Sequence, residues 1–191
     1  MPSLSTVASS DLDASQTPAL RKLRRLAHLL RAVSAGYACW VLWGILTWWL
    51  DAEKVQRNFS SYLGRDLSAM AASQRYGALA LDLLAWLLLV AAVVYCWKFL
   101  SCLSLPHRLR EAAKHISLCA WYAIACETFT ELSRPVQSFL VTSHLSNYEQ
   151  VWQWRFQQFD LLAVLFCLVL LMFAYAFTWT MEQAEENRSF V

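Results

Sequence analysis

Two long stretches of this sequence contain no charged residue, and this feature limits the folds open to the chain more than any other. They are Ala32–Leu50 and Leu161–Met181. A third apolar stretch, Leu79–Leu100, has only Asp82 near its start and Lys98 near its end. A helix needs about 20 mostly apolar residues to cross a bilayer core about 30 Å thick. The three stretches therefore predict transmembrane helices.

A fourth stretch, Ile116–Val141, is apolar at its start but carries Glu127, Glu131, Arg134 and Pro135 farther along. A hairpin or a helix on the membrane surface would also accommodate these residues. We favour a span because an even number of crossings agrees with the distribution of basic residues. The expected fold is an all-α membrane protein, a four-transmembrane-helix bundle. Its single domain would cover 19–191, with spans at about 32–50, 79–100, 116–141 and 161–181.

The basic residues are divided unevenly between the two sides of such a bundle. Ten belong to the N-terminal region, the linker after the second span and the tail: Arg21, Lys22, Arg24, Arg25, Arg31, Lys98, Arg108, Arg110, Lys114 and Arg188. Six belong to the other side: Lys54, Arg57, Arg65, Arg75, Arg134 and Arg155. Cytoplasmic segments carry the excess of Lys and Arg in membrane proteins. Both termini are therefore expected in the cytoplasm.

The N-terminal region divides into two parts. Residues 1–18 are rich in Ser, Ala and Asp without helical periodicity, which predicts a disordered arm. Beyond it, leucines at helical spacing alternate with a basic arm made of Arg21, Lys22, Arg24 and Arg25. Such a pattern is typical of a helix that lies on anionic lipid. The alternative is that these charges only set the topology.

Ionisable residues are expected inside the membrane, toward its outer face. A rise of 1.5 Å per residue places Glu127 roughly 16 Å from Ile116, near the middle of the bilayer. The predicted intramembrane polar cluster contains Asp82, Glu127, Glu131, Arg134 and Asp160. A charged group at bilayer depth costs at least ~2.5–3.5 kcal/mol, so such groups pair, face other helices or lose their charge.

This cluster admits two roles. It could be a proton- or cation-responsive site, or a polar clamp that ties the second, third and fourth spans together, since polar side chains also associate helices in membranes. Glu131 and Arg134 are three residues apart and can pair on one helix face. Both roles are kept as expectations.

Signatures of enzymes and metal sites are missing from the sequence. It has no H-E-x-x-H, G-x-S-x-G or Walker loop and no C-x-x-C pair. The six cysteines lie in or beside apolar stretches, where cysteine behaves as a small hydrophobic residue. We expect no catalytic residues, no metal and no cofactor. A net charge of only +2 gives no reason to expect direct binding of nucleic acid.

The order of these features resembles a known family. A basic N-terminus precedes four spans, with a short helical linker after the second, a proline in a polar third span and a tail that reads A-E-E-N-R-S-F-V. Over about residues 20–191, and most specifically over 161–191, the chain is similar to bacterial inner-membrane proteins of domain-of-unknown-function family twenty-nine seventy-five. The resemblance implies a multi-pass protein integral to the inner membrane, often encoded near a small helix-turn-helix regulator, and no catalytic residues.

The expected function is that of a non-enzymatic integral membrane protein that regulates or binds a partner. The expected partners are the lipid bilayer and either a cytoplasmic regulator protein or further copies of the chain. The alternative is a small oligomeric transporter or channel for protons or cations, with Glu127 in the path.

Overall fold

The computed structural model describes residues 18–103, 108–153 and 158–189, and this part of the chain contains helices and no strand. The all-α class predicted from the sequence is confirmed. The disordered arm expected at residues 1–18 falls outside this part except for Pro18. The helices are α2 (Pro18–Leu50), α3 (Ala52–Leu63), α4 (Ala72–Leu103), α5 (Leu109–Thr142) and α6 (Gln158–Ser189).

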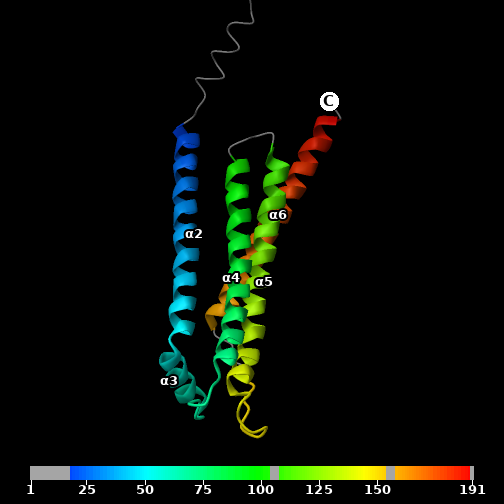
Figure 1. Ribbon diagram of the computed structural model, residues 1–191. Helices are drawn as coiled ribbons and strands as arrows, with labels where there is room; N and C mark the ends of the chain where they lie inside the picture. Colours follow the sequence, from blue (N-terminus) through cyan, green and yellow to red (C-terminus); the bar gives the residue numbers. More distant parts are fainter. Residues whose placement is uncertain (1–17, 104–107, 154–157, 190–191) are drawn as a thin grey trace, which may run out of the picture.

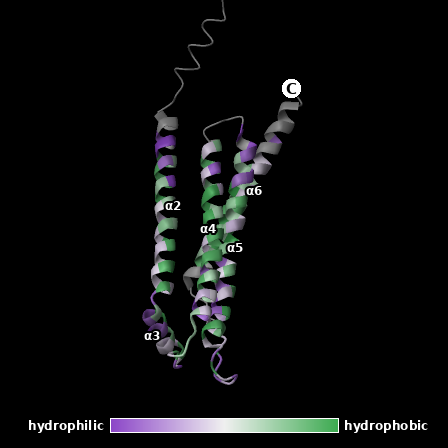
Figure 2. Cartoon of the chain, in the orientation of Figure 1, coloured by the Kyte–Doolittle hydropathy of each residue, from purple (hydrophilic) through white to green (hydrophobic). Residues whose placement is uncertain are grey.

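Four long helices run up and down along a common direction, with α6 more oblique than the others (Figure 1). The start of α2 and the end of α6 lie at one end of the molecule, whereas the short helix α3 lies at the other end. Figure 2 shows that hydrophobic residues dominate the middle of α4 and α5, while hydrophilic residues gather near the start of α2 and on α3. Hydrophilic ends around a hydrophobic middle are typical of helices that cross a membrane.

Three of the long helices are long and apolar enough to cross a bilayer, through Arg24–Leu50, Ala72–Cys102 and Leu162–Thr180. Most residues of these segments are not buried against the rest of the protein. For example, Trp43 of α2 is 68 % exposed and Phe173 of α6 is 65 % exposed. Large apolar surfaces of this kind are rare on soluble monomers. They indicate a membrane protein whose helices meet lipid.

Helix α3 has a well-defined start and end. Asp51 caps its first turn, because the Asp51 carboxylate accepts a hydrogen bond from the Lys54 backbone N–H at 3.0 Å. Gly64 ends the helix with φ 64°, a left-handed conformation that glycine adopts without steric cost. Apolar residues at spacings of three and four favour a helix in this loop. Val55 is one of these residues, and it is completely buried.

Each long helix runs close to its neighbours in chain order. In the described residues the backbones approach between α2 and α4, α4 and α5, α5 and α6, and α2 and α3. Side chains of α2, α3, α4 and α5 also meet in one buried cluster, which contains Trp49, Val55, Ala78 and Val141. A closed bundle would also bring the backbone of α2 close to that of α5 or α6. Helix α2 is therefore held at the edge of the assembly, by α4 along its length and by α3 near its end.

Alanines allow α4 and α5 to approach closely. Ala78, Ala85 and Ala92 of α4 are buried and recur every seven residues, so they lie on one side of the helix. That side faces α5, because the Cys126 thiol donates a hydrogen bond to the Ala85 carbonyl at 3.3 Å. Ala120 of α5 is also completely buried. Small residues are the usual contact surface between packed helices in membranes.

This alanine seam predicts that Ala85→Leu destabilises the protein. The larger side chain would push α4 away from α5, and overpacking of this kind typically costs about 1–3 kcal/mol. The matched control is Ala80→Leu, because Ala80 is exposed on the same helix. Thermal unfolding in detergent, followed by circular dichroism, should show a lower midpoint for Ala85→Leu than for Ala80→Leu. Equal midpoints would contradict the proposed contact.

Candidate functional site

Asp82 connects three helices near one end of the molecule. The Trp49 indole Nε1 of α2 donates a hydrogen bond to Asp82 Oδ2 at 2.5 Å, and the Gln137 amide Nε2 of α5 donates to Asp82 Oδ1 at 2.5 Å. Trp49 is only 1 % exposed. Both carboxylate oxygens are therefore satisfied by neutral donors from the two helices that flank α4. These hydrogen bonds join α2, α4 and α5, whereas the polar clamp expected from the sequence joined the second, third and fourth spans.

Further hydrogen bonds hold α2 to α4 along their length. The indole of Trp86 donates to the Ala38 carbonyl at 2.9 Å, and the indole of Trp97 donates to Ser34 Oγ at 2.8 Å. At the far end, Arg31 Nη2 donates to Ser101 Oγ at 2.7 Å. Hydrogen bonds between membrane helices contribute about 0.6 kcal/mol each on average. Together with the Trp49–Asp82 hydrogen bond, the hydrogen bonds of Trp86, Trp97 and Arg31 fix the register of α2 on α4.

Glu131 and Arg134 form an ion pair on α5, as their spacing predicts. Arg134 Nη1 lies 2.7 Å from Glu131 Oε1, and the two side chains are 28 % and 15 % exposed. Arg134 is also close enough to Asp82 for a favourable charge interaction. The structure thus gathers three of the five residues of the predicted polar cluster.

The other two members of the predicted cluster are placed differently. Glu127 lies one turn away from Glu131 on α5, near the thiols of Cys126 and Cys167. Because Cys167 belongs to α6, Glu127 is associated with the α5–α6 side of the assembly. Asp160 falls within α6, but its side chain lies outside the described part of the structure.

The chain that follows α5 folds back along the end of that helix. The Val151 backbone N–H donates to Thr142 Oγ1 at 3.1 Å, and the Gln153 backbone N–H donates to Ser138 Oγ at 3.1 Å. Ser138 and Thr142 are one turn apart on α5 and are both buried. Their hydroxyls therefore position Gln153 beside the polar cluster.

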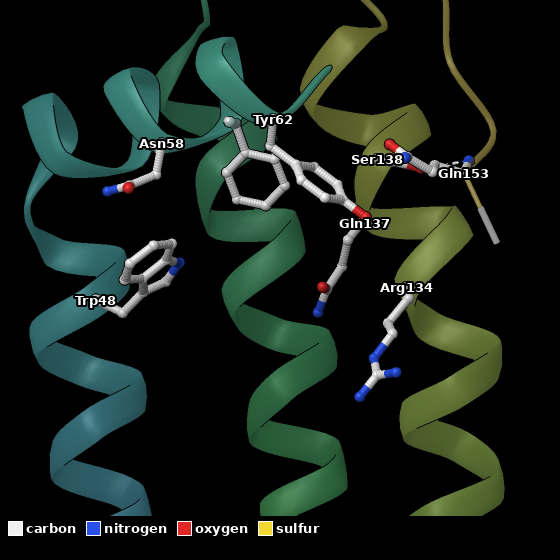
Figure 3. A pocket seen from close by; sticks show the side chains of 8 residues that line it. Trp48, Asn58, Tyr62, Arg134, Gln137, Ser138 and Gln153 are labelled. Atoms are coloured by element: carbon white, nitrogen blue, oxygen red, sulfur yellow. Dashed lines mark hydrogen bonds between the residues drawn. The ribbon is translucent and has the colours of Figure 1, made fainter. Parts of the chain in front are cut away.

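A pocket of about 560 Å³ opens beside this cluster. Figure 3 shows that its walls come from the end of α2, from α3, from α5 and from the returning chain, and that Tyr62 projects from α3 toward Gln137 and Arg134. The volume falls within the range of about 300–1,000 Å³ typical of small-molecule sites. Its described lining consists of Trp48, Asn58, Phe59, Tyr62, Arg134, Gln137, Ser138 and Gln153.

The chemistry of this lining suits binding. Arg134 is the one charged residue among the described lining residues, and Trp48, Phe59 and Tyr62 supply an aromatic wall. Lys54 places a second cation at the rim, with Nζ 5.4 Å from the centre of the Trp48 ring. In the described residues, no three His, Cys, Asp or Glu side chains gather so as to hold a metal ion. A ligand with one polar, charged end and a less polar body would match the pocket.

Most of the residues that line this pocket were not identified from the sequence. Arg134 was included in the predicted cluster, whereas Trp48, Phe59, Tyr62 and Gln137 were not. The helical spacing of apolar residues in the first loop was the available signal for Phe59 and Tyr62. It indicated a helix, but it could not indicate which groups that helix would face.

The polar bridge predicts graded losses of stability at Asp82. Asp82→Ala would leave the donors of Trp49 and Gln137 without an acceptor, at a cost of about 1–3 kcal/mol for each buried unsatisfied group. Asp82→Asn keeps one carbonyl acceptor and should cost less. Glu53→Gln, at an exposed position on α3, serves as the control. Unfolding in detergent with increasing dodecyl sulfate should give this order, and an unchanged midpoint for Asp82→Ala would refute the bridging role.

Comparison of the sequence with protein-family models, with curated proteins and with solved structures finds no match. The resemblance to domain-of-unknown-function family twenty-nine seventy-five therefore stays a prediction. Functional inference depends on the geometry of this chain alone.

Proposed function

We propose that this chain is a non-enzymatic, multi-pass protein of the inner membrane that senses a ligand at its outer side and conveys its presence to a cytoplasmic partner. The observation that carries the proposal is the continuity of α2. This helix extends without interruption from Pro18 to Leu50, about 50 Å at 1.5 Å per residue. It joins Trp48 in the pocket to the basic arm at its other end, where Lys22, Arg24 and Arg25 are exposed.

The position of α5 supports a fourth span. Its ionisable residues keep it from being apolar enough by composition alone, yet it packs between α4 and α6, which are both candidate spans. The Glu131–Arg134 pair and the local hydroxyl hydrogen bonds from Thr130, Ser133 and Ser138 reduce the cost of its polar groups. With α5 as a span, the excess of basic residues favours cytoplasmic termini.

The proposed mechanism is a small displacement of α2. A ligand in the pocket would contact Trp48 of α2 on one side and Arg134 of α5 on the other, so it would bridge these two helices. Away from Trp49, α2 is little buried and is joined to α4 by hydrogen bonds from Trp86 and Trp97, so we expect ligand binding to change its tilt about the buried Trp49. A rigid helix transmits that tilt to the basic arm.

The topology has a direct test. Reporter fusions at Val191 and in the linker at 106–114 should score as cytoplasmic, whereas fusions near Phe59 and Tyr148 should score as external. The expectation follows from four crossings and from the ten-to-six division of basic residues. An external C-terminus would remove α5 as a span and overturn the four-span arrangement.

The cytoplasmic role predicts a partner that depends on the basic arm. Cross-linking in intact cells, followed by purification of the tagged chain, should recover a cytoplasmic protein with the wild type. Replacement of Arg24 and Arg25 by Gln should reduce that recovery strongly, because two exposed charges at the end of α2 are lost. The matched control replaces the exposed residues Arg57 and Arg65 by Gln, on the opposite side. Equal recovery from both double variants would contradict the role of the arm.

The transport alternative depends on Glu127, and the same protein can be used to discriminate it. If the chain conducts protons or cations through Glu127, proteoliposomes should show a flux that Glu127→Gln abolishes. The sensing proposal predicts no such flux, since Glu127 lies toward Cys167 and is not among the described residues that line the pocket. A flux that Glu127→Gln removes would replace the sensing proposal.

A further inference from the structure

The pocket lies at the level where the apolar part of α2 ends. Trp48 is two residues from Leu50, the last residue of that candidate span, and α3 begins at Ala52. Tryptophan and tyrosine concentrate at this level in membrane proteins, because their rings are apolar and their N–H or O–H groups are polar. A site lined by Trp48 and Tyr62 is therefore placed where lipid headgroups meet the hydrocarbon core.

The charges around the pocket favour a ligand with a single negative charge. Arg134 presents a planar guanidinium, which binds phosphate and carboxylate oxygens with directed hydrogen bonds and carries enough donors for two acceptors. Lys54 adds a second cation at the rim. The carboxylates of Glu131 and Asp82 lie near Arg134 and weaken its field. The two cations and two carboxylates sum to about zero charge, so a phosphodiester with one negative charge fits this site better than a doubly charged phosphomonoester.

The surroundings of the pocket also offer a path for an acyl chain. Helices α2 and α5 both pack on α4, and at this level they are joined to each other through Asp82 rather than by close approach of their backbones. The aromatic wall of Phe59 and Trp48 suits the glycerol backbone and the first carbons of a chain that continues into the bilayer.

We infer that the pocket binds the phosphodiester headgroup of a glycerophospholipid, with Arg134 as the receptor for its phosphate. The lipid would approach from the outer leaflet, with its headgroup between α3 and α5. This inference names the ligand for the proposed sensing function and rests on the outer placement of the pocket. The signal would then be the phospholipid composition of the outer leaflet.

The inference is tested by binding measurements on the whole purified chain in lipid-depleted detergent. Dioctanoyl phosphatidylglycerol should bind with one site per chain in isothermal titration calorimetry. Dioctanoylglycerol lacks the phosphate, and glycerophosphoglycerol lacks the acyl chains; both should bind at least about tenfold more weakly, because each lacks one of the two contacts. Tight binding of dioctanoylglycerol would eliminate the phosphate contact, and tight binding of glycerophosphoglycerol would make the ligand a soluble phosphodiester.

Variants assign the contact to Arg134. The double change Glu131→Gln with Arg134→Gln removes both charges of the ion pair together, so Glu131 is not left as an unpaired carboxylate, and it should weaken lipid binding by about tenfold or more. Lys54→Gln should weaken it less, since Lys54 lies at the rim. Arg57→Gln is the control, because Arg57 is exposed on α3 and is not among the described lining residues. Unchanged affinity in a double variant that keeps its unfolding midpoint would overturn the inference.

This test is separate from those of the proposed function. Loss of lipid binding with retained recovery of a cytoplasmic partner would reject the phospholipid and leave the sensing role. Lipid binding without any partner that depends on the basic arm would reject the sensing role and leave the site.

Discussion

A carboxylate in an apolar helix requires hydrogen-bond donors from outside that helix, because the backbone donors around it are already used. Asp82 obtains them from Trp49 and Gln137, so α2 and α5 are both fixed to α4 at one level. The pocket has its walls at the same level: Trp48 precedes Trp49 in the chain, and Gln137 lines the pocket itself. The need of Asp82 for hydrogen-bond donors thus accounts for the level at which α2, α4 and α5 are joined. It also accounts for which side chains line the pocket.

The helices could largely be predicted from the sequence, and their mutual packing could not. Apolar runs identified α2, α4 and α6 because burial in lipid demands them. For α2 the sequence predicted a basic amphipathic helix before a span that begins at Ala32, and the structure has both in one helix from Pro18. Hydropathy detects only the part of a helix that meets hydrocarbon. The polar turns beyond that part form their backbone hydrogen bonds within the helix, whether they lie in water or in lipid. Which helices pack against each other also could not be predicted. Hydropathy does not distinguish a closed bundle from an arrangement in which each helix packs mainly on the helices next to it in the sequence.

The candidate site was predictable only where its chemistry was local. The pairing of Glu131 with Arg134 follows from a spacing of three on one helix. The partners of Asp82 do not, because Trp49 and Gln137 are neutral and far away in sequence, and they meet Asp82 only through the rotation of their helices. The same holds for Tyr62, whose role depends on where α3 folds. A scan for charges finds the groups that need partners, and packing decides which partners they obtain.

The arrangement of contacts in chain order has a consequence for synthesis of the protein. Each helix that enters the membrane finds its partner already present, so assembly need not wait for a distant segment. Trp49 is made before Asp82 and offers its indole when α4 arrives, but Gln137 is made only with α5. Between these two moments one oxygen of Asp82 lacks its final donor. The newly made α2–α4 pair therefore offers a hydrogen-bond acceptor, the free oxygen of Asp82. Because hydrocarbon has no donor for this oxygen, it favours the association of α5 with the pair.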